Sequence, residues 1–214
     1  MKNSQRLLII VNDPAFFLSH RAPIALAAKK EGLEVHVATA HGEASEKVIA
    51  LGLNYHTIPM SRSGINPISE IKCLISLYKL IKQVNPHIVH LVTIKPVLYG
   101  GFIARILRTP AVVAAISGLG SVFVAQSIPR KMRKYFVLLI YQFSLGHKNI
   151  RVIFQNPDDK NKLLSAQVIH EKKTTTIRGS GVDLSLCPVK DEPEGVPVIA
   201  MAARLLKEKG VEIF

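Results

Sequence analysis

The sequence predicts an α/β fold, with a mainly parallel β-sheet flanked by helices from residue 7 to about residue 184. Three observations lead to this prediction. Continuous aliphatic runs, such as residues 7–11, are typical of strands that are covered on both faces. Amphipathic segments alternate with these runs, which implies right-handed parallel crossovers. Hydrophobic residues make up 48% of the chain and charged residues 20%, so a sizeable core is available and whole-chain disorder is excluded.

The first third of the chain shows this alternation clearly. We expect strands at residues 7–11, 35–38 and 55–59, and a short helix at residues 44–50. A loop, Asn12-Asp13-Pro14, follows the first strand. Ser19 can then cap a helix that runs to about Lys30 and that Gly32 can close.

The middle of the chain repeats the rhythm. Asn66 followed by Pro67 is a helix-start signal. The helix that follows carries apolar residues at steps of three and four, which predict one buried face with Lys72, Lys79 and Lys82 off it. The residues of this face are Ile68, Ile71, Leu74, Tyr78, Ile81 and Val84. Further strands are expected at residues 88–92, 111–116, 152–154 and 174–177, and helices at residues 96–107, 129–143 and 157–165.

The C-terminal part differs in composition. Residues 187–197 carry three prolines, a glycine and four charged residues, which is typical of a linker. We therefore expect a first domain at residues 1–186 and, at residues 198–214, the first strand and helix start of a second domain. One strand and a helical stub cannot build a core, so we expect this second domain to be truncated. The alternative is a C-terminal helix that packs on the first sheet.

The charge of the chain indicates the kind of partner. With 28 Lys and Arg against 15 Asp and Glu, the formal charge is +13, which favours nucleic acid, a phosphorylated small molecule or a lipid headgroup. No aromatic-interleaved basic motif or zinc-finger spacing occurs, so we expect no nucleic acid. Cys73 and Cys187 form no CxxC pair, which argues against a disulfide scaffold and a Cys-based zinc site. No signal-peptide core and no apolar run near the roughly 20 residues of a spanning helix is present, so we expect a cytoplasmic protein.

The segments after the strands are where an open α/β sheet binds ligands. They are rich in Gly, Ser, Asn and Lys, whose exposed amides and neighbouring helix N-termini favour an anion. No GxGxxG follows the first strand and no GxxxxGK[ST] occurs, which disfavours a standard NAD fold and a P-loop NTPase. The candidate cleft or acceptor residues are Asn12, His20, Lys95, Ser117, Gly118 and Gly120.

Several of these residues, and one acidic pair, have a structural alternative. His20 can act as an acid or base if its loop lines a cleft, or it can cap or pack a helix. Lys95 can reach a phosphate or remain solvated, and Gly118 and Gly120 can simply form a tight turn. Asp158 and Asp159 can bind a metal or complement a helix dipole, and we expect the second role and no metal.

A basic run precedes an apolar run in the helix expected at residues 129–143. The basic residues are Arg130, Lys131, Arg133 and Lys134, and residues 135–140 are apolar or aromatic. This order is typical of a helix that lies on an anionic membrane surface. A core helix with a solvated basic end has the same pattern.

Several segments together resemble a known family. Residues 178–183, Arg-Gly-Ser-Gly-Val-Asp, followed after the linker by residues 198–210, resemble the domain junction of family 4 glycosyltransferases. Residues 16–21, 95–100 and 116–120 resemble segments of a bacterial polysaccharide-building branch of that family. The likeness covers essentially the whole chain. It implies a retaining enzyme of the GT-B fold, in which two Rossmann-like domains face each other across a cleft.

The resemblance also implies substrates and site residues. It implies a nucleotide-sugar donor, bound mainly by the second domain, with Arg204 and Lys209 on the donor diphosphate. Two fixed cations suit that role because they stabilise the charge that grows on the leaving group. The first domain would bind the acceptor, a saccharide or a polyprenyl-diphosphate-linked sugar at the inner membrane face. The family generally needs no metal or other cofactor.

The sequence also departs from the family. The family's Glu-x7-Glu pair would lie beyond Phe214, and Asn12-Asp13-Pro14 replaces the glycine pair usual in the first loop. We therefore expect a fragment of a glycosyltransferase of cell-surface polysaccharide or lipopolysaccharide synthesis that is inactive by itself. One alternative is a non-catalytic membrane- or partner-binding α/β domain. Another is a deacetylase or epimerase, for which the sequence shows neither a metal-ligand cluster nor a dinucleotide motif.

Overall fold

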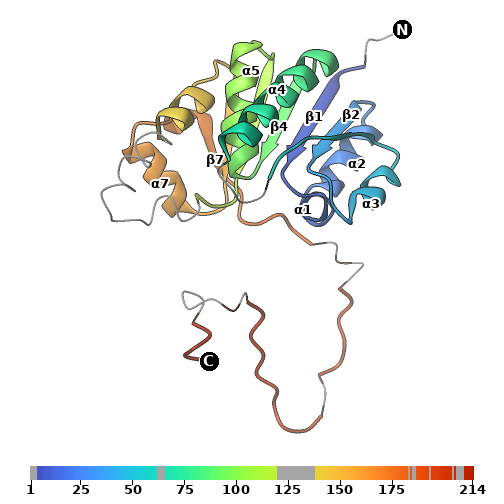
Figure 1. The fold of residues 1–214 in the computed structure, drawn as a ribbon. Coiled ribbons are helices and arrows are strands. Elements are labelled where there is room, and N and C mark those ends of the chain that lie inside the picture. Colours follow the sequence, from blue (N-terminus) through green and yellow to red (C-terminus); the bar gives the residue numbers. More distant parts are fainter. Residues whose placement is uncertain are drawn as a thin grey trace. The chain divides into compact units, whose positions relative to one another are not determined.

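The computed structural model describes residues 4–61, 66–119, 138–182, 184, 187–192, 194–203, 205 and 210–214. The chain separates into two units, Met1–Gly181 and Val182–Phe214. The first unit holds a seven-stranded sheet with helices on its faces (Figure 1). The predicted α/β class is thus confirmed.

Every neighbouring pair of strands in the sheet is parallel. The strand order is β3-β2-β1-β4-β5-β6-β7, which contains the Rossmann order. The strands are β1 (Arg6–Val11), β2 (Glu34–Thr39), β3 (Asn54–Thr57), β4 (Ile88–Val92), β5 (Ala111–Ile116), β6 (Ile150–Phe154) and β7 (Thr174–Thr176). Each strand expected between residues 7 and 177 is present, with ends that differ by a few residues.

The helices in the described part of the first unit lie on both faces of the sheet. They are α1 (Pro14–His20), α2 (Ala22–Lys30), α3 (Ser45–Ile49), α4 (Pro67–Val84), η1 (Pro96–Gly100), α5 (Gly101–Ile106), a helix whose described residues are 138–145, α7 (Pro157–Ser165) and η3 (Glu171–Lys173). η1 is a π-helical turn that leads directly into α5. The expected helix at residues 96–107 is confirmed in this form.

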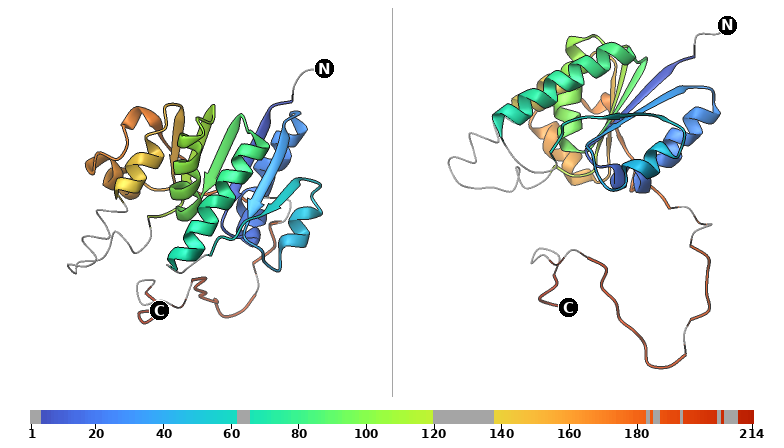
Figure 2. Two further views of the ribbon diagram at one scale, coloured as in Figure 1. Left: turned by 45° about the horizontal axis from the view of Figure 1, so that its top comes forward. Right: turned by 45° about the vertical axis from the view of Figure 1, so that its right-hand side comes forward.

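Two hydrophobic cores explain the aliphatic strands. Leu8 of β1 belongs to the core that also contains Leu77 of α4. Its neighbour Ile9 belongs to the opposite core, with Phe17 of α1 and Ala25 of α2. Figures 1 and 2 show α4 and α5 on one side of the sheet and α1, α2 and α3 on the other. Successive side chains of a strand point to opposite faces, so both must be apolar here.

The first helical segment differs from the prediction. Asp13, and not Ser19, is the N-cap, because its carboxylate accepts a hydrogen bond of 2.9 Å from the Phe16 N–H. Ser19 lies inside α1 and its hydroxyl donates to the Ala15 carbonyl. The expected single helix is broken at Arg21 into α1 and α2. Pro23 explains the break, since a proline ring inside a helix clashes with the carbonyl four residues earlier.

The buried face of α4 also differs from the prediction. The buried residues are Cys73, Leu77, Leu80, Ile81 and Val84. Ile68 and Ile71 of the expected face are 66% and 56% exposed, and Tyr78 is 38% exposed. The helix carries apolar residues on two stripes that both satisfy steps of three and four, so periodicity cannot choose between them. Asn66 caps the N-terminus as expected, by accepting from the Ile68 N–H.

The helix expected at residues 129–143 and the strand expected at residues 198–202 can be compared with the structure only in part. Residues 138–145 are helical, while residues 129–137 of the expected helix lie outside the described residues. In the second unit, residues 198–202, expected as a strand, pair with no strand in the described part of the chain. A strand needs a hydrogen-bonded neighbour, so this expectation is not met. The division into two domains and a linker stays a prediction.

Candidate functional site

The strand order places a topological switch point between β1 and β4. From β1 the chain adds β2 and β3 on one side, and from β4 it adds β5, β6 and β7 on the other. Open α/β sheets bind ligands at this point, outside the carboxyl ends of the strands. Asn12 follows β1, and residues 93–95 follow β4. These residues form the centre of the candidate site.

Thr93 is held in a strained conformation at the switch point. Its φ is +73°, in the left-handed region that a β-branched residue rarely adopts. Its backbone N–H donates to the Ala115 carbonyl at 3.3 Å, and its carbonyl accepts from the Val97 N–H at 3.1 Å. Its buried hydroxyl has no hydrogen-bond partner among the described residues. Strain of this kind costs about 1–3 kcal/mol and is typical of ligand sites.

Lys95 forms part of a charged cluster on the α4 side of the sheet. Its Nζ lies 2.6 Å from Oε1 of Glu70 and 2.9 Å from Oγ of Ser61. Both side chains of the ion pair are largely buried. A phosphate at Lys95 would therefore compete with the Glu70 carboxylate. The role expected for Lys95 stays a prediction.

Glu70 influences two further groups of this cluster. Burial, together with a hydrogen bond to Glu70, raises the pKa of the Tyr99 hydroxyl above its ordinary value. Burial and the charge of Glu70 raise the pKa of the Cys73 thiol to about 11, although Lys95 opposes this shift. Both groups therefore remain protonated at neutral pH. Glu70, Tyr99 and Cys73 are site residues that the sequence analysis did not identify.

His20 lies at the C-terminal end of α1. Its Nδ1 is 2.7 Å from Oγ of Ser19, and its ring stacks on Phe16 at 4.1 Å between centroids. These contacts correspond to the packing alternative, and they leave a role in acid–base chemistry untested.

Ser117 and Gly118 follow β5, the strand next to β4, so they lie at the same edge of the sheet as Asn12 and Lys95. Gly120 lies outside the described residues, as do Arg130, Lys131, Arg133, Lys134, Arg204 and Lys209.

Comparison with known proteins assigns the chain to a family. Residues 6–156, which include strands β1 to β6, match the family described as "Glycosyl transferase 4-like". The chain belongs to this family.

A curated relative from Campylobacter jejuni, N,N'-diacetylbacillosaminyl-diphospho-undecaprenol alpha-1,3-N-acetylgalactosaminyltransferase, is 27% identical to this glycosyl transferase 4-like chain. The match covers 92% of the chain and 58% of the relative. The chain thus spans little more than half the length of the relative.

Solved structures show the same fold. A glycosyltransferase from Rickettsia africae is similar with a TM-score of 0.55 and 19% identity, over 82% of this chain and 43% of that one. UDP-GlcNAc 2-epimerase from Methanocaldococcus jannaschii is similar with a TM-score of 0.56 and 21% identity, over 80% of this chain and 45% of that one. The fold is therefore shared by transferases and epimerases, and the family match is what distinguishes them for this chain.

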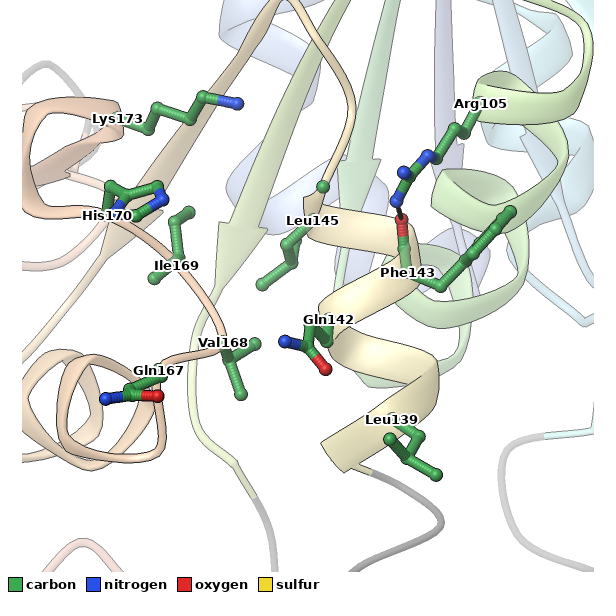
Figure 3. Close-up of a pocket in the computed structure, with 11 residues that line it drawn as sticks. Arg105, Leu139, Gln142, Phe143, Leu145, Gln167, Val168, Ile169, His170 and Lys173 are labelled. Atoms are coloured by element: carbon green, nitrogen blue, oxygen red, sulfur yellow. Dashed lines mark hydrogen bonds between the residues drawn. The ribbon is translucent and has the colours of Figure 1, made fainter.

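A separate pocket of the glycosyl transferase 4-like chain lies at the opposite edge of the sheet. It has a volume of about 520 Å³ between the end of α5, residues 139–146 and the segment that leads into β7 (Figure 3). Arg105 stands over the Phe143 ring at 4.3 Å and donates to the Phe143 carbonyl at 2.6 Å. This pocket faces the amino ends of the strands, away from the switch point. We call it the amino-edge pocket and do not include it in the candidate site.

Asp159, one of the acidic pair at α7, has a structural role. The Asp159 N–H donates to Oδ1 of Asn156 at 2.8 Å, and Asn156 Nδ2 donates back to Asp159 Oδ2 at 3.0 Å. This reciprocal cap explains why Asp159 is buried at a helix start. Within the described ranges no group of three or more His, Cys, Asp or Glu residues has the geometry of a metal site.

Proposed function

We propose that this chain is the acceptor-side part of a glycosyltransferase that moves a sugar from a nucleotide-sugar donor to a polyprenyl-diphosphate-linked or saccharide acceptor. The family match over residues 6–156 carries the proposal, because it includes the switch point with Asn12, Lys95 and Ser117. The Campylobacter relative's name specifies a sugar carried on diphospho-undecaprenol as its substrate. The formal charge of +13 suits such an anionic acceptor.

The chemistry of the proposed reaction assigns roles to residues outside the first unit. A retaining transferase must stabilise a departing nucleoside diphosphate and a cationic sugar-like transition state. We assign the first task to Arg204 and Lys209, whose fixed charges need no metal or other cofactor. The printed sequence contains no Glu-x7-Glu pair for the second task. We therefore expect no sugar transfer by the 214-residue chain alone.

We further propose that the protein acts on the cytoplasmic face of the membrane as a peripheral protein. Arg130, Lys131, Arg133 and Lys134 provide the basic part of the proposed surface. Separately, helix α4 carries an exposed apolar stripe at steps of three and four, made of Ile68, Ile71, Ile75 and Tyr78, with exposed lysines beside it. Such a face is typical of helices that lie in the lipid headgroup region. None of the helices in the described ranges is long and apolar enough to cross a bilayer.

Binding to a defined acceptor tests the proposed function. The 214-residue chain should bind a short polyprenyl-diphosphate-linked hexosamine more tightly than the same polyprenol without diphosphate. It should produce no glycosylated product from any nucleotide sugar, as measured by mass spectrometry. Equal affinity for the two lipids would contradict the acceptor role. Detected turnover would contradict the expected inactivity and show that the printed chain contains a complete catalytic site.

A further inference from the structure

Arg21, at the break between α1 and α2, is a buried cation that forms no ion pair with a described carboxylate. The residue is 6% exposed, and no ion pair joins it to an acidic group among the described residues. One terminal nitrogen donates to the His20 carbonyl at 2.8 Å and to Oγ of Ser180 at 2.9 Å. Its Nε is buried and has no partner within the described ranges. A buried guanidinium of this kind is costly unless an anion compensates its charge.

His90 lies beside Arg21 on the central strand β4. In the register of β1 and β4, His90 stands next to Ile9, whose side chain packs in the core beneath α1 and α2. His90 therefore lies on the same face of the sheet as these two helices. Its Nε2 is buried and, in the described part of the chain, has no hydrogen-bond partner. Burial and, to a lesser extent, the positive charge of Arg21 lower the pKa of His90 to about 4. The ring is therefore neutral at pH 7 and adds one N–H donor without a second buried charge.

Arg21 and His90 line one cavity, which we call the Arg21 cavity. It has a volume of about 270 Å³ and extends over the ends of β5 and β6 to the loop at residues 177–181. The loop contributes Arg178 to the lining, and none of the described lining residues is Asp or Glu. The backbone N–H groups of residues 179–181 have no acceptor among the described residues. Donors from three separate elements thus line a space whose described lining carries no negative charge.

We propose that the Arg21 cavity is a binding site for a diphosphate group. Guanidinium groups bind phosphate oxygens through paired N–H donors, and backbone N–H groups complete such sites. The volume of about 270 Å³ is far above the roughly 10–15 Å³ that one water molecule needs, so the cavity has room for a larger group. A nucleoside diphosphate and a polyprenyl diphosphate share this chemistry. Which of the two carries the group rests on the proposed function, whereas the affinity for diphosphate itself does not.

The loop that lines the cavity lies close in sequence to the end of the first unit. Ser180, which accepts from Arg21, stands two residues before the second unit begins at Val182. Gly179 and Gly181 on either side of it have φ values of +73° and +76°, a conformation that L side chains rarely adopt. The loop geometry therefore depends on both glycines. A diphosphate in the cavity would bridge α1, the sheet and this loop.

Calorimetric titration of the 214-residue chain with inorganic diphosphate, in the absence of metal, tests the proposal. The parent should bind one diphosphate, and Arg21→Met should lower the affinity by about tenfold or more. The matched control, Lys47→Met, removes an equal charge from an exposed position on α3 and should change the affinity by less than about twofold. Arg21→Met should be no less stable than the parent without diphosphate, because it removes a buried charge that no described carboxylate compensates.

Two further measurements keep the test decisive. If Arg21→Met does not fold, the exposed Arg178→Met replaces it and should also weaken diphosphate binding. Titration with uridine diphosphate and with farnesyl diphosphate identifies the carrier, and preference for either one supports the site. Failure of the parent to bind inorganic diphosphate, or equal binding by parent and cavity variants, would overturn the proposal. Binding of inorganic diphosphate without any acceptor binding would support the diphosphate site and contradict the proposed acceptor role.

Discussion

His90 should make the stability of the protein depend on pH. Its folded-state pKa is about 4, against about 6.5 in an unfolded chain. The unfolded chain therefore takes up a proton below pH 6.5, whereas the folded chain does not until about pH 4. The stabilisation is complete above pH 6.5 and is lost as the pH falls toward 4. A difference of this size corresponds to about 3 kcal/mol of unfolding free energy.

Urea denaturation between pH 7 and pH 4 measures this contribution. His90→Gln keeps a polar group but cannot titrate, so its unfolding free energy should fall less with pH than that of the parent. Burial also lowers the pKa of His56 and His147, but both remain in the variant and cancel in the comparison. The matched control is His41→Gln, which removes an exposed histidine far from β4 in the sequence. Parallel curves for the parent and His90→Gln would refute the reasoning.

Three other predictions concern strain, packing and membrane binding. Thr93→Gly removes the strain of the positive φ but makes the unfolded chain more flexible, so the unfolding free energy from urea denaturation should stay equal or rise. A decrease of about 1 kcal/mol or more in this free energy would show that Thr93 is not strained. Leu77→Ala should cost about 2–5 kcal/mol, whereas the exposed Ile71→Ala should cost about 0.5 kcal/mol or less; equal losses in thermal unfolding would contradict the buried face of α4. Each cation near an anionic surface contributes about 1 kcal/mol, so removing the four basic residues should weaken vesicle flotation by about a thousandfold, and most strongly at low salt; unchanged flotation would favour the core-helix alternative. That variant replaces Arg130, Lys131, Arg133 and Lys134 by Gln.

The parallel sheet could be predicted because its signal is local. The five consecutive apolar residues of β1 contribute to two cores, one on each face of the sheet. An apolar run of this short length is typical of a strand covered on both faces. Asn66-Pro67 likewise marked the start of α4 through a local hydrogen bond. The same kind of signal, Asp13-Pro14, stands before α1, where the sequence analysis expects a loop and a later cap at Ser19.

The site could be predicted only in outline. The carboxyl edge and the positions of Asn12, Lys95 and Ser117 follow from the order of elements. The ion pair of Lys95 with Glu70 joins residues 25 apart, and the contact of Arg21 with Ser180 joins residues 159 apart. Nothing local marks such pairs. The strain at Thr93 and the neutral state of His90 depend on how other segments pack around β4. Local sequence patterns do not predict such packing.

The central claim is that the carboxyl edge of the sheet binds a lipid-linked saccharide acceptor. Photo-crosslinking tests it most directly, with a polyprenyl-diphosphate saccharide that carries a photoreactive group on its sugar. Mass spectrometry of the digested chain should place the crosslinks in peptides that contain residues 93–100 and 116–119, and excess unlabelled acceptor should abolish them. Crosslinks confined to the amino-edge pocket, in residues 139–146 and 167–173, or crosslinks that excess acceptor does not reduce, would contradict the claim.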